Sequence, residues 1–165
     1  MQLESQQFAE TVFKWLESDD IREIGVKRIN NRVKAVPAML QNNGLMMTLV
    51  TLEASSDKCD KKIGRFICEY LHDERLASAA SGEANTNDVA NKATSDNALL
   101  LDKTITQLQA LTLTRYFFAQ TKTAQLVNWV KQISQAKKEL SEATKQEKQD
   151  SADAATADTE TGDAG

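Results

Sequence analysis

The sequence predicts an all-α protein, a compact helical bundle of five or six helices followed by a disordered acidic C-terminal tail. Six Gly and one Pro in 165 residues are about 4% of the chain against roughly 12% in average proteins, which argues against a fold of many short strands and tight turns. Apolar residues recur at helical spacing in most segments. The last residues contain no large apolar side chain, so they have nothing to bury.

Two helices are predicted before the single proline. Residues 3–18 and 21–36 each place apolar side chains three or four positions apart, which forms one apolar face per helix. Pro37 ends the second helix, because the residue before a proline is displaced from the α region. A proline is also well placed in the first turn of the next helix.

Residues 38–53 are the most apolar stretch and predict a buried helix that contains Gly44. A glycine inside a helix costs about 1 kcal/mol relative to alanine. Gly44 therefore suggests close approach of another backbone or a local kink, and a turn at Asn43 and Gly44 is the alternative.

The remaining elements follow from the same periodicity. A helix is predicted at residues 58–78, and a small and polar stretch at 78–97 predicts a mobile loop. Residues 98–111 and 112–145 form either one long helix or a helical hairpin broken near Thr112. The domain prediction is thus a helical domain at 1–148 and a disordered tail at 149–165.

The net charge of −4 conceals an uneven distribution. Residues 150–165 hold five acids and no base, so residues 1–149 carry 20 Lys and Arg against 19 Asp and Glu. A nearly neutral body with local basic stretches is compatible with nucleic-acid contact. The absence of an apolar run long enough to cross a membrane, of a signal sequence and of a disulfide pattern predicts a cytoplasmic protein without membrane contact.

No catalytic, metal-binding or cofactor-binding residue is predicted. Glu69 and His72 have the spacing of a metal-ligand pair, but one His in the chain excludes the second pair that such sites need. Cys68 and His72 could form a dyad, although neighbouring acids would keep the thiol protonated. We therefore expect a protein that is not an enzyme.

A cationic strip on the second helix is the strongest candidate site. Arg28 and Arg32 are predicted to flank the apolar face on one side, and Lys27 and Lys34 on the other, with Asn30 and Asn31 between them. The face opposite the apolar one is thus predicted to be a cationic strip with amides. Such a strip is either an ordinary solvated face or a surface that contacts nucleic-acid phosphates. A weaker basic set, Arg115, Lys122 and Lys137, lies on the last helix, where Phe117, Phe118 and Trp129 are interpreted as core residues rather than base-stacking platforms.

Two segments carry a resemblance to a known family. Residues 32–49 read RVKAVPAMLQNNGLMMTL, and residues 119–131 contain Leu126 and Trp129 before a basic residue. Together they resemble the small subunit of type III-B CRISPR effector complexes, the Cmr complexes. The family often carries arginines early in its first helix, but Gln6 and Gln7 stand at the matching places here, so the resemblance implies no RNA contact from that helix.

The resemblance implies an all-helical, non-catalytic subunit that stacks in several copies along the guide–target RNA. Its expected partners are the CRISPR guide RNA and target RNA, the backbone repeat subunits, the large polymerase-like subunit and further copies of itself. The phosphate contacts are then expected at Lys27, Arg28, Arg32 and Lys34, and a partner interface at Gln41, Asn42, Asn43 and Gly44.

Two alternatives remain at this point. A small subunit of the related type III-A complex would share RNA binding but differ in its partners. A helical protein-binding adaptor without RNA contact would instead use the apolar side chains of Met39, Met46 and Met47, since methionine surfaces adapt to varied partners.

Overall fold

The computed structural model describes residues 4–73 and 96–157, and these residues form seven helices and no strand. The predicted all-α class is therefore confirmed. The predicted mobile loop at 78–97 lies almost wholly outside the described residues, as do residues 158–165.

The N-terminal third contains one more helix than predicted. Helices α1 (Glu4–Glu17), α2 (Asp19–Ile24) and α3 (Val26–Val33) follow one another with very short connections. The single helix predicted at 21–36 is wrong, because Gly25 has a φ of +92° that breaks it into α2 and α3. Glycine is the residue that adopts this conformation without a steric penalty.

The next helices follow the predictions more closely. Helix α4 (Val36–Ala54) begins with Pro37 in its first turn, as predicted, and α5 spans Lys58–Asp73. Helix α6 (Asp96–Gln109) and helix α7 (Leu113–Ala157) are separate. Of the two alternatives, the break near Thr112 is therefore the one found.

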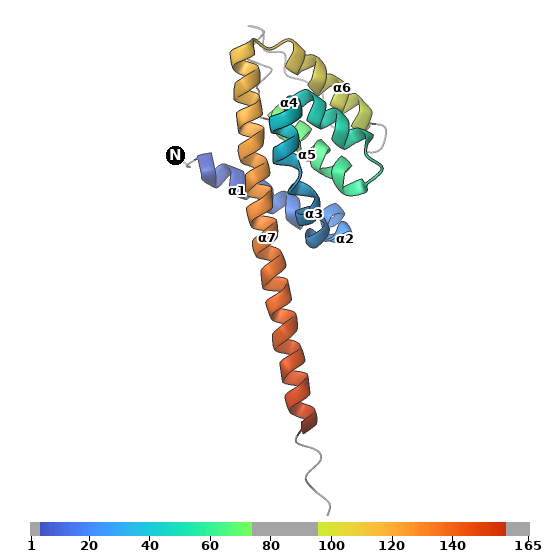
Figure 1. Cartoon of the computed structure of the whole chain (residues 1–165), viewed down its shortest axis with the longest axis vertical. Coiled ribbons are helices and arrows are strands. Elements are labelled where there is room, and N and C mark those ends of the chain that lie inside the picture. The colour runs from blue at the N-terminus through green and yellow to red at the C-terminus, as the bar shows by residue number, and fades with distance from the viewer. Residues whose placement is uncertain (1–3, 74–95, 158–165) are drawn as a thin grey trace, which may run out of the picture.

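Helix α7 organises the molecule. It contacts α1, α3 and α4, while α5 packs against α4 and α6. Figure 1 shows α1 crossing α7 and the other helices gathered on one side of it, with the C-terminal part of α7 extending well beyond the bundle. The helix continues as far as Ala157, into the segment predicted as tail.

The core joins the apolar faces of the helices. Trp15 of α1 stacks on Phe66 of α5, with ring centroids 4.3 Å apart and an interplanar angle of 14°. Other buried apolar residues come from five helices, namely Val12, Leu16, Ile29, Val33, Leu45, Leu49, Ile63, Ile67, Leu126 and Val130. Burial of such side chains is the main stabilising contribution, at about 1.5 to 3 kcal/mol each. Within the described ranges, no helix is long and apolar enough to cross a membrane.

Candidate nucleic-acid interface

Helix α3 presents its cations to solvent because its apolar residues are fixed in the core. Ile29 and Val33 are fully buried, and α3 packs against both α7 and α5. The side chains of all four predicted RNA-binding residues are exposed as a result: Lys27, Arg28, Arg32 and Lys34. The structure thus brings together the four cations that the sequence singled out.

One predicted member of this strip lies elsewhere. Asn30 was expected among the exposed amides, but it is fully buried against α7. Its side-chain Nδ2 donates hydrogen bonds to Ser134 Oγ at 3.0 Å and to the Lys131 carbonyl at 3.3 Å. Asn31, by contrast, is exposed as expected. Asn30 is therefore a residue that ties α3 to α7, and the prediction for it is wrong.

Arg32 forms a two-point ion pair with Asp60 of α5. Its Nε donates to Asp60 Oδ1 at 2.8 Å and its Nη2 donates to Asp60 Oδ2, while Ser55 Oγ donates to the same carboxylate at 2.6 Å. The hydrogen bonds from Arg32, helped by the one from Ser55, hold the pKa of Asp60 below its ordinary value of 3.8. Two parallel bonds are the strong geometry for an arginine and a carboxylate.

Carboxylates also lie near the other cations. Asp57 Oδ1 accepts a hydrogen bond from the Cys59 backbone N–H at 2.8 Å, which caps the start of α5, and it lies 3.5 Å from Arg28 Nη2. Lys27 Nζ lies 3.5 Å from Glu142 Oε1 of α7. Lys27, Arg28 and Glu142 are exposed, which makes both contacts weak. Lys34 makes no ion pair with any described residue and is the least neutralised of the four.

Helix α5 adds lysines that the sequence reasoning missed. Lys58 and Lys61 are exposed at its start, and Lys62 pairs with Asp20 of α2. These three lysines line a hollow of about 250 Å³ between α2 and α5, where Asp20 and Glu23 also lie and offset part of their charge. Because α3 and α5 are in contact, the basic surface is wider than the α3 strip. The run of three lysines in residues 58–62 was the available signal.

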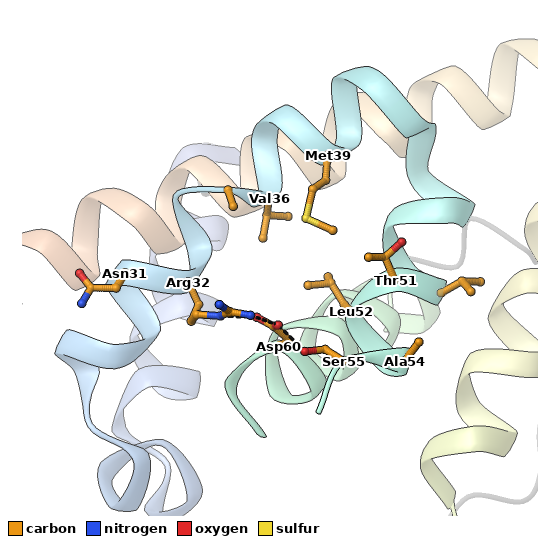
Figure 2. A pocket seen from close by; sticks show the side chains of 11 residues that line it. Asn31, Arg32, Val36, Met39, Thr51, Leu52, Ala54, Ser55 and Asp60 are labelled. Carbon is orange, nitrogen blue, oxygen red and sulfur yellow. Dashed lines mark hydrogen bonds and ion pairs between the residues drawn. The ribbon is translucent and has the colours of Figure 1, made fainter. Parts of the chain in front are cut away.

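A groove of about 630 Å³ borders the strip at Arg32. Figure 2 shows Arg32 and Asp60 at one side of it, with Val36, Met39 and Leu52 from α4 on the other. Its walls are mainly apolar, with the polar end formed by the Arg32 and Asp60 pair. The pair therefore separates an apolar recess from the cationic surface.

The predicted partner interface lies at a kink in α4. Gly44 has φ +73° and ψ 173°, a combination that interrupts the helix and is essentially restricted to glycine. Gln41, Asn42 and Asn43 are exposed beside it. The predicted local kink is thus confirmed, while the use of these residues as an interface stays a prediction.

Helix α7 satisfies the backbone groups that the kink leaves without helical partners. The Tyr116 hydroxyl oxygen accepts hydrogen bonds from the N–H groups of Leu45 at 3.1 Å and Met46 at 3.4 Å. Gln120 Nε2 donates to the Leu40 carbonyl at 3.3 Å. A Cβ on Gly44 would lie 3.3 Å from the Tyr116 hydroxyl oxygen. The expected close approach at Gly44 is therefore made by a side chain and not by another backbone.

Two aromatic residues of α7 are not where the sequence interpretation placed them. Phe117 and Phe118 were interpreted as core, but they are 54% and 52% exposed. Trp129 is partly buried and packs against the core as expected. Helical spacing cannot distinguish these cases, because it reveals a shared face without showing whether another helix covers that face.

The buried thiol of Cys68 has the properties of a packing residue. Burial raises its pKa to about 11, so the thiol is protonated at neutral pH and is a poor nucleophile. Among the residues that the structure describes, no group of three or more His, Cys, Asp or Glu side chains could hold a metal ion.

Comparison with known protein families gives a match over most of the chain. The sequence model of a family described as CRISPR-associated protein (Cas_Cmr5) matches residues 4–137, which include all of α1 to α6 and the part of α7 that packs in the bundle. No curated protein and no solved structure matches the chain significantly.

Proposed function

The chain belongs to the Cas_Cmr5 family and so is a small subunit of a type III-B CRISPR effector complex, in which we propose that it stacks in several copies along the guide–target RNA. The proposal includes phosphate contacts from Lys27, Arg28, Arg32 and Lys34. The family match favours type III-B over the related type III-A complex.

The exposed cations on the outer side of α3 carry this proposal. The opposite side of the helix is held in the core by Ile29 and Val33, so the cations have a fixed direction toward solvent. Asp57, Asp60 and Glu142 offset part of their charge. A single copy should therefore bind weakly, and several aligned copies gain strength through effective concentration.

The proposed partners follow from membership of the complex. They are the guide and target RNA, the backbone repeat subunits, the large polymerase-like subunit and neighbouring copies of this chain in the cytoplasm. Gln41, Asn42, Asn43 and Gly44 are proposed to face a protein partner, since three exposed polar side chains stand directly before the kink on a mainly apolar helix.

The subunit is proposed to be non-catalytic. The protonated state of the Cys68 thiol supports this. Cleavage of target RNA should accordingly require the other subunits.

Replacing Lys34 by glutamate in the assembled complex tests the RNA contact. Lys34 is chosen because Arg32→Glu would place a third carboxylate beside Asp57 and Asp60 and disturb the fold. Lys34→Glu should weaken target binding equally for all sequences, since phosphate contacts carry no base information. It should also reduce the slope of log K against log salt by about 1 for each contacting copy.

Lys103→Glu is the matched control, because Lys103 is an exposed lysine on α6 and the charge change is the same. Equal effects of the two substitutions would mean that net charge, and not the α3 surface, determines binding. No effect of Lys34→Glu would contradict the contact.

A further inference from the structure

Two exposed phenylalanine rings along the α1 and α7 contact each lie beside a lysine. Phe118 of α7 is 52% exposed and Phe13 of α1 is 44% exposed. Lys122 Nζ lies 5.2 Å from the Phe118 ring centroid, and Lys137 Nζ lies 5.2 Å from that of Phe13. We call Phe13, Phe118, Lys122 and Lys137 the aromatic edge.

The charge around the aromatic edge suits an anionic partner. Residues 113–138 of α7 carry five Lys and Arg and no acid. On α1, Glu10 pairs with Lys14 at 2.7 Å and Glu17 pairs with Lys137 at 3.1 Å. Glu17 therefore offsets part of the charge of Lys137 itself, and the positive charge of the edge comes mainly from α7, where Arg115 lies one turn before Phe118.

The exposed rings of Phe13 and Phe118 can stack on a planar partner. The core does not need them, because Phe8 on α1, at 5% exposure, already fills the position beneath Lys122. A cation over an exposed ring is a weak interaction. A phosphate can therefore displace the ring contacts while each ring receives a base, and at Lys137 it must also displace the ion pair with Glu17.

We propose that the aromatic edge binds single-stranded RNA, with Phe118 and Phe13 stacking on unpaired bases and Lys122 and Lys137 contacting the phosphates beside them. This proposal rests on the RNA-contacting role proposed above but uses a different surface. Aromatic rings interleaved with cations are the usual means of holding single strands without sequence preference. A duplex hides its base faces, so the edge should prefer unpaired RNA.

Phe118 and Lys137, the outermost residues of the aromatic edge on α7, are far apart along the helix. Residues 118 and 137 are 19 positions apart, which corresponds to about 28 Å along the helix axis. The strand would therefore run from the Phe118 ring past Lys122 toward Phe13 on α1, which lies five positions after Phe8, the residue whose ring is 5.8 Å from Lys122 Nζ. Since α1 and α7 pack together, the spacing is set by the bundle and not by a loop.

The proposal is tested by measuring the affinity of the full chain for a short single-stranded RNA and for a strand of the same length that lacks bases. Phe118→Leu should weaken binding of the base-containing strand by about fivefold or more and leave the abasic strand unchanged. Phe118→Trp should retain binding, because it keeps an aromatic face. Circular dichroism should show all variants folded, since Phe118 is half exposed.

Phe117→Leu is the matched control, because Phe117 is an equally exposed neighbour and no lysine lies over its ring in the described structure. It should bind both strands as the unaltered chain does. Lys34→Glu, which tests the α3 surface, should affect base-containing and abasic strands alike, so the two proposals can fail independently.

Several results would overturn the aromatic edge as an RNA site. These are no binding of single-stranded RNA by the unaltered chain at low salt, an unchanged affinity in Phe118→Leu, or an equal loss on the abasic strand. Unchanged RNA affinity together with weaker binding of Phe118→Leu to the other effector subunits would identify the edge as a protein interface instead.

Discussion

Single residues set the direction of the surfaces that we assign to partners. Gly44 turns α4 at a conformation that other residues adopt only under strain, and Asn30 fixes α3 on α7 through its buried amide. Gly44 was recognisable from the sequence because it breaks a local rule. Asn30 was not, since its partner Ser134 is distant in the chain and helical periodicity places Asn30 only at the border between the apolar face and the cationic strip.

Replacing Gly44 by alanine should destabilise the protein by about 1 to 3 kcal/mol, because a Cβ strains the backbone at φ +73°. The Cβ would also crowd the Tyr116 hydroxyl group at 3.3 Å. Urea unfolding measures the change. Asn43→Ala, at an exposed position beside the kink, is the control and should change stability by less than about 0.5 kcal/mol. Equal stability of Gly44→Ala and the unaltered chain would show that the kink is not required.

Asn30→Ala should cost about 1 to 3 kcal/mol, since it leaves the buried Ser134 hydroxyl group and the Lys131 carbonyl without this donor. The exposed Asn31→Ala is the comparison and should be nearly neutral. Thermal unfolding of both variants measures the difference in stability. An Asn30→Ala protein as stable as Asn31→Ala would mean that the contact with α7 contributes nothing.

Asp60 should make stability depend on pH at the acidic end. Its pKa in the folded state is below the ordinary value of 3.8 because Arg32 donates to the carboxylate. A lowered pKa stabilises the fold above the unfolded value, and this stabilisation is lost as the pH falls through the folded-state value. The free energies of unfolding of Asp60→Asn and of the unaltered chain should therefore differ at pH 6 and converge as the pH falls below 3.8. A difference that persists or grows at low pH would contradict the ion pair.

At the scale of helices, the sequence predicted the positions of the helices better than the contacts between them. The apolar spacing located α1, α4, α5 and α7, and Pro37 located the start of α4. The break at Gly25 was missed although the sequence carried a sign of it, because the apolar set that supports this helix begins only at Val26 and Ile24 lies about 140° away from Ile29 on an ideal helix. The exposure of Phe117 and Phe118, and the pairing of Arg32 with Asp60, depend on which helices meet, and a one-dimensional pattern does not contain that information.

The end of α7 should be dispensable for folding. Residues 141–146 are exposed, and Figure 1 shows this part of the helix leaving the bundle. Deletion of residues 151–165 should change the melting temperature by no more than about 2 °C, since α7 has already left the bundle before this segment begins and the ends of a chain outside the core contribute little. A drop of about 10 °C would place this segment in the folded core.

For the whole molecule, the central claim is that an all-helical subunit presents the outer side of α3 to RNA within the assembled effector complex. The bundle holds that side outward through the contacts of α3 with α5 and α7, and the family match provides the complex in which copies can align. Partial neutralisation by Asp57 and Asp60 makes assembly, and not the free chain, the setting in which the surface should act.

Site-specific photo-crosslinking in the assembled complex with guide and target RNA is the most direct measurement of this claim. A crosslinking side chain at position 34 should attach to RNA, whereas the same group at position 103 on α6 should not. Attachment of the group at position 34 to protein alone, in a complex that still binds its target, would contradict the account.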